Sequence, residues 1–306
     1  ASQVAARIRK TSPEKVATAV VCVGNLTMGG TGKSPVTMAI MEMLRTRDVN
    51  AQGLTRGYGG SVKGPVCVDL FRHTAKDVGD EPLLLAQAGP VWVSRDRVAG
   101  ADAAILHEAA AIVMDDGHQN PQLHKDLSIV VIDAEAGWGN RRVFPAGPLR
   151  EPVTTGLSRA DAVILMLPEA GYQPDYAALG LDEVELPVLT AWLEPQDGPP
   201  KEKLFAVAGI GRPEKFFRAI AAHGATISGT KAYPDHHDFS RADLRQLRQL
   251  AEQHEARLIT TEKDFVRIPA AERDGITAWP VRACFSEPAR VQALLDQALD
   301  AAASRR

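Results

Sequence analysis

The sequence predicts an α/β protein of two domains, the first of them a mostly parallel sheet between layers of helices. Its 306 residues exceed the size at which single cores stop growing, roughly 250–300 residues. Short apolar runs rich in β-branched residues alternate with helical patterns along most of the chain. A stretch rich in Pro, Gly and Glu separates two such series, which indicates a linker between two domains.

Composition is that of a globular protein, with 45% hydrophobic and 24% charged residues. A net charge of −3 gives no electrostatic reason to expect a nucleic acid as the partner. The three cysteines, Cys22, Cys67 and Cys284, lie too far apart for a disulfide framework or a zinc-binding spacing, which favours the reducing cytoplasm. Apolar runs are all shorter than the roughly 18–20 residues that cross a bilayer, and no signal peptide is visible.

The first 17 residues form a polar and basic tail. A frayed tail or a surface helix is one interpretation, and a weak contact with an anionic membrane surface is the other. The chain begins at Ala1 without Met, so either the initiator was removed or an N-terminal piece is missing.

The first domain, residues 18–167, begins with an apolar strand at 20–23, a glycine-rich loop at 24–32 and a helix at 35–45. Such a loop turns backbone N–H groups toward an anion, and Lys33 at the start of the helix adds a full charge. Ser34 would offer its hydroxyl to Mg²⁺. Thr27 stands where the general G-x-x-x-x-G-K-[ST] motif has glycine, so a structural glycine turn is the alternative to a nucleotide site.

Alternating strands and helices continue through this domain. We expect strands at 51–55, 66–68, 90–93, 109–114, 127–132 and 161–167, and helices at 83–87 and 98–107. Their order predicts helices on both faces of the sheet. Because parallel strands place their carboxyl ends at one edge, the loops that follow them form one candidate ligand surface.

Several polar residues follow these strands. Asp80 lies near a helix start, where a carboxylate is either a cap or a functional group. Asp115 and Asp116 end one buried strand and Asp133 ends the next, so they compete for a Mg²⁺ role; we favour the adjacent pair. The loop at 138–152 carries Arg150 and Glu151 between prolines, where they are candidates for substrate or phosphate contacts.

Residues 168–203 form the predicted linker, with a possible strand at 188–193, and residues 204–306 form the second α/β domain. Its expected helices are 213–223, 241–254 and 288–302, and its expected strands include 225–233, 257–261 and 276–284. His236 and His237 are a weak case for zinc, since a third ligand is missing, and a better case for one proton carrier; histidines of a surface loop are the plain alternative.

Taken together, these blocks resemble the tetraacyldisaccharide 4'-kinase family, the lipid A kinases of Gram-negative bacteria. The resemblance covers residues 20–268, in the family's order, and rests on segments 23–35, 56–60, 78–82, 96–97, 115–119, 145–152, 208–211, 234–237 and 260–264. Thr27 belongs to the family's own loop pattern. The resemblance implies two α/β domains joined by a short β linker, with ATP bound in the cleft between them.

The resemblance also implies a role for each matching residue. Asp80 would accept the proton of the sugar hydroxyl, supported by His236, although sequence alone does not separate His236 from His237. The ATP loop would comprise Thr27, Met28, Gly29, Gly30, Thr31, Gly32, Lys33 and Ser34. Ser34, Asp115 and Asp116 would hold Mg²⁺. The residues facing the substrate or the transferring phosphoryl would be Tyr58, Gly59, Arg97, His118, Gln119, Arg150 and Glu151.

The implied reaction moves the γ-phosphoryl group of ATP to the 4'-hydroxyl of a tetraacylated glucosamine disaccharide 1-phosphate. We expect a monomer, in the cytoplasm or peripherally on the cytoplasmic face of the inner membrane, because the substrate is an acylated lipid. Relatives have an apolar, basic helix before the first strand, and the mostly polar 19 residues here depart from that pattern. The alternatives are a P-loop kinase or NTPase with a soluble substrate and a non-catalytic nucleotide-binding protein.

Overall fold

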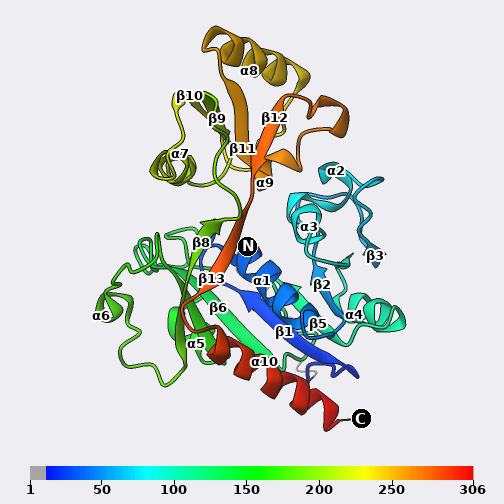
Figure 1. Cartoon of the computed structure of the whole chain (residues 1–306). Coiled ribbons are helices and arrows are strands. Elements are labelled where there is room, and N and C mark those ends of the chain that lie inside the picture. The colour runs from blue at the N-terminus through cyan, green and yellow to red at the C-terminus, as the bar shows by residue number, and fades with distance from the viewer. Residues whose placement is uncertain (1–11, 306) are drawn as a thin grey trace.

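A computed structural model describes residues 12–305, whose strands form one sheet of nine strands and one of four (Figure 1). The larger sheet contains β1 (Ala19–Gly24), β2 (Ala51–Thr55), β3 (Val66–Cys67), β4 (Val91–Val93), β5 (Ala111–Asp115), β6 (Leu127–Asp133), β7 (Ala162–Met166), β8 (Val188–Pro195) and β13 (Val281–Phe285). Its helices are α1 (Lys33–Arg45), α2 (Ala75–Val78), α3 (Asp80–Leu85), α4 (Arg97–Leu106), α5 (Val153–Leu157), α6 (Tyr176–Leu179) and α10 (Pro288–Ala303).

The larger sheet has the order β13-β8-β7-β6-β1-β5-β2-β4-β3. Its edge pairs, β3–β4 and β8–β13, are antiparallel and the other pairs are parallel. Strands β1, β5, β6 and β7 are buried along their whole length because helices cover both faces, which is why their sequences are continuous apolar runs. The predicted α/β fold with a mostly parallel sheet is confirmed.

The smaller sheet has the parallel order β10-β9-β11-β12. Its elements are β9 (Leu204–Ala208), β10 (Ile227–Ala232), β11 (Arg257–Thr261), β12 (Ile276–Trp279), α7 (Pro213–Ala222), α8 (Arg241–Gln253), α9 (Glu262–Phe265) and the 3₁₀ turn η2 (Ala270–Glu272). Phe216 and Ile220 of α7 pack in one apolar cluster with this sheet, and Leu244 and Leu247 of α8 pack in another.

The strand expected at 276–284 is two strands in different sheets. Pro280 lies between them and has no N–H for a ladder, so β12 ends in the smaller sheet and β13 pairs with β8 in the larger one. The final helix, α10, follows β13 and buries Val291 and Leu295 in the core cluster that also contains Leu44 of α1. The boundary predicted for the second domain, 204–306, therefore differs from the structure: residues 281–303 belong with the larger sheet, as does β8 from the predicted linker.

Two strands carry the chain between the two units. Pro195 of β8 pairs with Val281 of β13, and the Gln196 N–H donates to the Pro280 carbonyl at 3.0 Å. Figure 1 shows β8 and β13 side by side where the chain passes from the larger unit to the smaller. The contact of Arg212 with Asp133, the last residue of β6, shows that the smaller unit lies against the carboxyl end of the larger sheet.

Much of the predicted N-terminal tail, and with it the predicted membrane contact, lies outside the described residues. Within residues 12–17, Glu14 forms a bridge with Leu123 and Val16 is buried, so this part of the predicted tail packs on the larger unit. No helix within residues 12–305 combines the length and apolar character needed to span a bilayer.

Candidate active site

The glycine-rich loop leads from β1 directly into α1. Gly32 has φ +86°, a left-handed conformation that glycine adopts without strain, and the loop turns there so that Lys33 begins the helix. The first N–H groups of α1 have no partners within the helix and, with the positive end of its dipole, suit an anion. The half-buried Ser34 is the second residue of α1, one place after Lys33.

The Thr27 position is explained by pairing with the loop at 138–152. Thr27 forms an antiparallel bridge with Leu149, and the Met28 N–H donates to the Pro148 carbonyl at 2.7 Å. The Arg150 N–H in turn donates to the Leu26 carbonyl at 2.8 Å. Thr27 is thus extended backbone at the base of the loop, and the turn itself uses Gly29 and Gly32.

Asp116 joins the glycine-rich loop to Arg150. The Lys33 ammonium lies 3.6 Å from Asp116 Oδ1, and Arg150 Nη1 donates to both carboxylate oxygens at 2.8 and 2.9 Å. Burial alone would raise the pKa of Asp116, but the charges of Lys33 and Arg150 hold it below its usual range. The Lys33 ammonium, the Arg150 guanidinium and the Asp116 carboxylate therefore lie together beside the glycine-rich loop.

Asp115 is fully buried beside this group. The Thr37 hydroxyl donates to Asp115 Oδ1 at 2.9 Å, while Oδ2 is buried without a hydrogen-bond partner. Burial, and then the charge of Glu81 in the first turn of α3, raises the pKa of Asp115 to about 7. An unpartnered carboxylate oxygen next to a second carboxylate suits a hard divalent cation. The charge of such a cation would offset the burial and the Glu81 charge that raise the pKa of Asp115.

Asp133, the competing carboxylate, lies at the end of β6 and is already engaged by the smaller unit. Arg212 Nη2 donates to Asp133 Oδ2 at 2.7 Å, and the Lys215 ammonium lies 3.2 Å from the same oxygen. Two further N–H groups, of Glu135 and Ala136, donate to Asp133 Oδ1 at 3.0 and 2.9 Å. The geometry thus favours Asp115 and Asp116 over Asp133 as the cation ligands.

Asp80 meets His236 and Arg267 across the two units. Asp80 Oδ2 accepts from Arg267 Nε at 2.8 Å and Arg267 Nη2 at 2.6 Å, and it lies 3.0 Å from His236 Nδ1. Asp80 and Arg267 are both buried, whereas the His236 side chain is 40% exposed. Burial would raise the pKa of Asp80, but the His236 hydrogen bond and the Arg267 charge hold it well below its usual range.

Surrounding groups separate the two adjacent histidines. Lys263 Nζ lies 3.4 Å from His236 Nε2, and the exposed Tyr58 ring stands edge-on to the imidazole at 6.4 Å. His237 instead stacks on Tyr233 at 4.3 Å and lies 3.3 Å from Asp243, in the first turn of α8. The structure therefore brings His236, and not His237, to Asp80.

Gln119 and Glu151 brace the loop at 138–152. Gln119 Nε2 donates to the Asn25 carbonyl and to Glu151 Oε1, each at 2.9 Å, and Arg159 Nη2 donates to both Glu151 oxygens at 2.7 Å. These contacts hold Glu151, the residue after Arg150, next to Asn25 at the start of the glycine-rich loop.

His118 and Arg97 are buried. His118 is 2% exposed, and its ring nitrogens lie 2.9 Å from Ser128 Oγ and the Gly156 carbonyl. This placement argues against the substrate contact predicted for His118, because its ring instead ties β6 to α5. Arg97 bonds the Ser94 carbonyl, and burial, then the charge of Arg56, lowers its pKa to about 10. Arg97 Nε is buried without a partner, so a neighbouring anion could still be accommodated.

Comparison with known proteins places this architecture in one family. The family model of tetraacyldisaccharide-1-P 4'-kinase matches residues 2–300. The chain belongs to this family. It is 55% identical to the tetraacyldisaccharide 4'-kinase of Maricaulis maris, over 97% of this chain and 88% of that protein. It is 51% identical to the tetraacyldisaccharide 4'-kinase of Caulobacter vibrioides, over 94% of this chain and 88% of that protein.

A solved structure matches the fold. The LpxK protein of Aquifex aeolicus, crystallised with ATP, superposes with a TM-score of 0.74 at 24% sequence identity. The match covers 94% of this chain and 91% of that one, so both units are included.

Three site residues were missed by sequence reasoning: Arg267, Glu81 and Thr37. Arg267 follows a short helix whose existence the sequence did not signal, and a lone arginine there carries no motif. Glu81 is the neighbour of Asp80 in segment 78–82, and Thr37 lies one helical turn after Lys33. The only sequence signal for Glu81 and Thr37 is their spacing from the predicted site residues Asp80 and Lys33.

Proposed function

We propose that this protein is an ATP-dependent kinase that phosphorylates the 4'-hydroxyl of a tetraacylated glucosamine disaccharide 1-phosphate. Membership of the tetraacyldisaccharide-1-P 4'-kinase family supports this activity. The observation that carries it is the contact between Asp80 and His236, which joins a carboxylate of the larger unit to a histidine of the smaller one. Such a pair can orient a hydroxyl group and accept its proton.

The glycine-rich loop supplies the phosphate site in this proposal. The N–H groups at the start of α1 and the Lys33 ammonium bind the β- and γ-phosphates, since both are positively polarised and fixed by the fold. Arg150, which shares the Asp116 carboxylate with Lys33, neutralises charge on the transferring phosphoryl group. Lys33 and Arg150 are held by one carboxylate, so their separation is set before the substrate arrives.

Ser34, Asp115 and Asp116 would hold Mg²⁺, for which the unpartnered Asp115 Oδ2 is the supporting observation. The cation supplies charge neutralisation for the β- and γ-phosphates. Asp115 is kept in place by Thr37 whether or not it is ionised.

Asp80 acts on the 4'-hydroxyl of the acceptor in this proposal. The 4'-oxygen attacks the γ-phosphorus, the bond from that phosphorus to the β–γ bridging oxygen breaks, and ADP leaves with the bond electrons. The three contacts on Asp80 all end on Oδ2, so we assign Oδ1 as the atom that takes the hydroxyl proton. Because its pKa is lowered, Asp80 accepts that proton late, when the sugar oxygen has become acidic by bonding to phosphorus.

The acylated acceptor requires the protein to act at a bilayer surface. We propose peripheral contact with the cytoplasmic face of the inner membrane, and Tyr58, Gly59, Gln119 and Glu151 as residues toward the acceptor. Tyr58 is exposed and lies beside His236, which supports its assignment to the acceptor side of the site.

Phosphorylation of the purified disaccharide tests the proposal. With ATP and Mg²⁺ we expect a product that carries one additional phosphate, at the 4' position, and that is absent when Lys33 is replaced by Met. If the folded protein binds ATP and yields no phosphorylated disaccharide, the proposed function is wrong.

A further inference from the structure

The turn between β3 and α2 presents two large apolar side chains to solvent. Leu70 is 48% exposed, and Phe71, at 101%, is the most exposed large apolar side chain among the described residues. The turn lies at the edge of the larger unit, because β3 is the last strand in the sheet order. Figure 1 shows β3 and α2 at that outer edge. The Phe71 ring therefore contributes nothing to the core.

Hydrogen bonds hold residues 69–73, the 69–73 turn, in a defined conformation. The Asp69 N–H donates to His73 Nδ1 at 2.9 Å, and the His73 N–H donates back to the Asp69 carbonyl at 2.8 Å. The Phe71 N–H donates to Asp69 Oδ1 at 2.9 Å, and Arg72 Nε lies 3.5 Å from Asp69 Oδ2. Because the backbone is already ordered, Leu70 and Phe71 can bind a partner without the entropy loss of ordering a flexible loop.

The surroundings of this turn are basic. In the segment 56–76 Asp69 is the only acidic residue, although the whole chain has a net charge of −3. Four exposed basic residues belong to the same segment: Arg56, Lys63, Arg72 and Lys76. Exposed apolar side chains flanked by basic ones are typical of surfaces that bind anionic bilayers.

The turn is also connected to the acceptor site. The helix α2 follows it directly, and Asp80 lies two residues after the end of α2. The Ser61 N–H donates to the Lys76 carbonyl at 3.0 Å, which ties the loop that carries Tyr58 to α2. One part of the larger unit therefore contains the exposed apolar pair, Tyr58 and Asp80.

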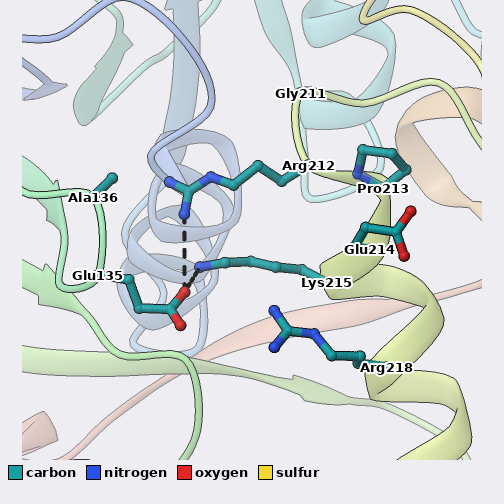
Figure 2. Close-up of a pocket in the computed structure, with 8 residues that line it drawn as sticks. All are labelled: Glu135, Ala136, Gly211, Arg212, Pro213, Glu214, Lys215 and Arg218. Atoms are coloured by element: carbon teal, nitrogen blue, oxygen red, sulfur yellow. Dashed lines mark ion pairs between the residues drawn. The ribbon is translucent and has the colours of Figure 1, made fainter. Parts of the chain in front are cut away.

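Ion pairs join the two units on both sides of the glycine-rich loop. Figure 2 shows Arg212 and Lys215 extending from α7 toward Glu135, in the turn after β6. On the other side, Lys76 of α2 lies 3.1 Å from Asp238 of the smaller unit. In the sheet, β6 flanks β1 on one side, and β5, β2, β4 and β3 follow on the other. Substitutions in the 69–73 turn are thus separated from the glycine-rich loop by several strands.

We propose that the 69–73 turn inserts Leu70 and Phe71 into the surface of an anionic phospholipid bilayer. This inference rests on the proposed function, since an acylated disaccharide is an acceptor that resides in a bilayer. The two apolar side chains enter the boundary between head groups and acyl chains, while Arg72 and the neighbouring lysines contact lipid phosphates. Docked in this way, the larger unit holds Asp80 near the bilayer in which the acceptor lies.

Fluorescence quenching by brominated phospholipid tests where the turn lies. Phe71→Trp places an indole at its tip, and vesicles that mix phosphatidylglycerol with brominated phosphatidylcholine should quench that indole. Leu193→Trp is the matched control, because Leu193 is also exposed and lies on β8, near the opposite edge of the sheet. We expect its fluorescence to stay unchanged when the vesicles are added.

Vesicle flotation tests how much the turn contributes to binding. We expect Leu70→Ser combined with Phe71→Ser to lower the partition coefficient onto phosphatidylglycerol vesicles by roughly 10-fold or more, the scale of two apolar side chains returned to water. The kcat/KM for the disaccharide in vesicles should fall by a similar factor. The Kd for ATP and the activity on a short-chain, water-soluble disaccharide should stay unchanged, and Leu193→Ser should leave all four quantities unaltered.

Several results would overturn the proposal. One is that Phe71→Trp is quenched no more than Leu193→Trp. Another is that the serine pair lowers activity on the soluble disaccharide as much as on vesicles, because the turn then acts on the acceptor or on the fold. Conversion of a dimer to a monomer by the serine pair would show that a second copy covers the turn. A protein that docks on vesicles and phosphorylates neither disaccharide would contradict the proposed function and leave the docking turn established.

Discussion

The Asp80 carboxylate lies 3.0 Å from His236 Nδ1, although the two residues are 156 positions apart in the chain. Arg267 Nη2 contacts the same carboxylate oxygen at 2.6 Å and, through Nη1, the Gly209 carbonyl at 2.8 Å. Packing of α3 against α9 brings these groups together. A candidate proton acceptor is thus assembled only when the two units are in contact, and such sites commonly depend on closure.

Replacing Asp80 with Asn should lower kcat by roughly 10²–10⁴-fold, the range for groups that transfer protons. Asn keeps the shape of the side chain and cannot accept the proton, so the Kd for ATP should change little. Steady-state kinetics and ATP titration measure the two quantities. Asp102→Asn, an exposed change on α4, is the matched control. Normal turnover by the Asp80 variant would show that Asp80 is not the proton acceptor and serves only the contacts that join the two units.

Replacing Arg267 with Met should lower the free energy of unfolding by about 3–5 kcal/mol, the usual effect of removing one member of a buried ion pair. The change leaves Asp80 and Asp264 without their shared cation, and both are buried. Urea denaturation measures the loss. The control is Arg290→Met on α10, whose partner Glu287 precedes the helix and is exposed, and it should stay within about 0.5 kcal/mol of the parent. An equal effect of the two changes would contradict the buried network.

Lys33→Met should raise the Kd for ATP by roughly 10–100-fold, because a charge-assisted contact to phosphate contributes about 1.5–3 kcal/mol. Titration with ATP measures the change. Lys201→Met, in the exposed connection between β8 and β9, removes the same charge far from the loop and should leave affinity unaltered. Unchanged affinity in the Lys33 variant would mean that the ammonium pairs with Asp116 and does not bind phosphate.

Asp115 should make the metal-free protein less stable as pH rises toward neutrality. Its carboxyl has a native pKa of about 7, against about 3.9 in an unfolded chain, so between these values the native state holds a proton that the unfolded state has released. The free energy of unfolding should therefore fall by up to about 1.4 kcal/mol for each pH unit in that window.

Comparison with Asp115→Asn isolates this contribution from those of other carboxyls. Urea denaturation with a chelator present, from about pH 5 to about pH 7, should show the variant gaining stability relative to the parent as pH increases. Mg²⁺ should reduce that relative gain by binding the ionised carboxylate. A pH-independent difference between the two proteins would contradict the raised pKa.

His118 and Tyr58 were both predicted to face the substrate. Replacing His118 should mainly affect stability, whereas replacing Tyr58 should mainly affect substrate binding. His118→Asn removes the ring that bonds Ser128 and Gly156, so it should lower the free energy of unfolding by about 1–3 kcal/mol with little change in KM for the disaccharide. Tyr58→Ala should raise that KM and leave stability nearly unchanged, since the ring is 73% exposed. Urea denaturation and kinetics on both variants decide between the two roles.

The fold was largely predictable because its signals are local. The β-branched runs that became β1, β5, β6 and β7 are buried on both faces, so their apolar residues are continuous and easy to recognise. The short helices α2, α5, α6 and α9 were missed, because four or five residues show no helical periodicity.

The sequence by itself determined the phosphate loop and the acidic strand end, since each depends on neighbours in the chain. It could not determine that Pro280 sends β13 back to the larger sheet, because a strand's partner is chosen by long-range packing. It could not place Arg267 on Asp80, or Arg212 on Asp133, because those contacts join residues 187 and 79 positions apart. The tertiary structure also decided between His236 and His237: burial and charge are set by what surrounds a side chain in space, and only His236 was carried to the carboxylate.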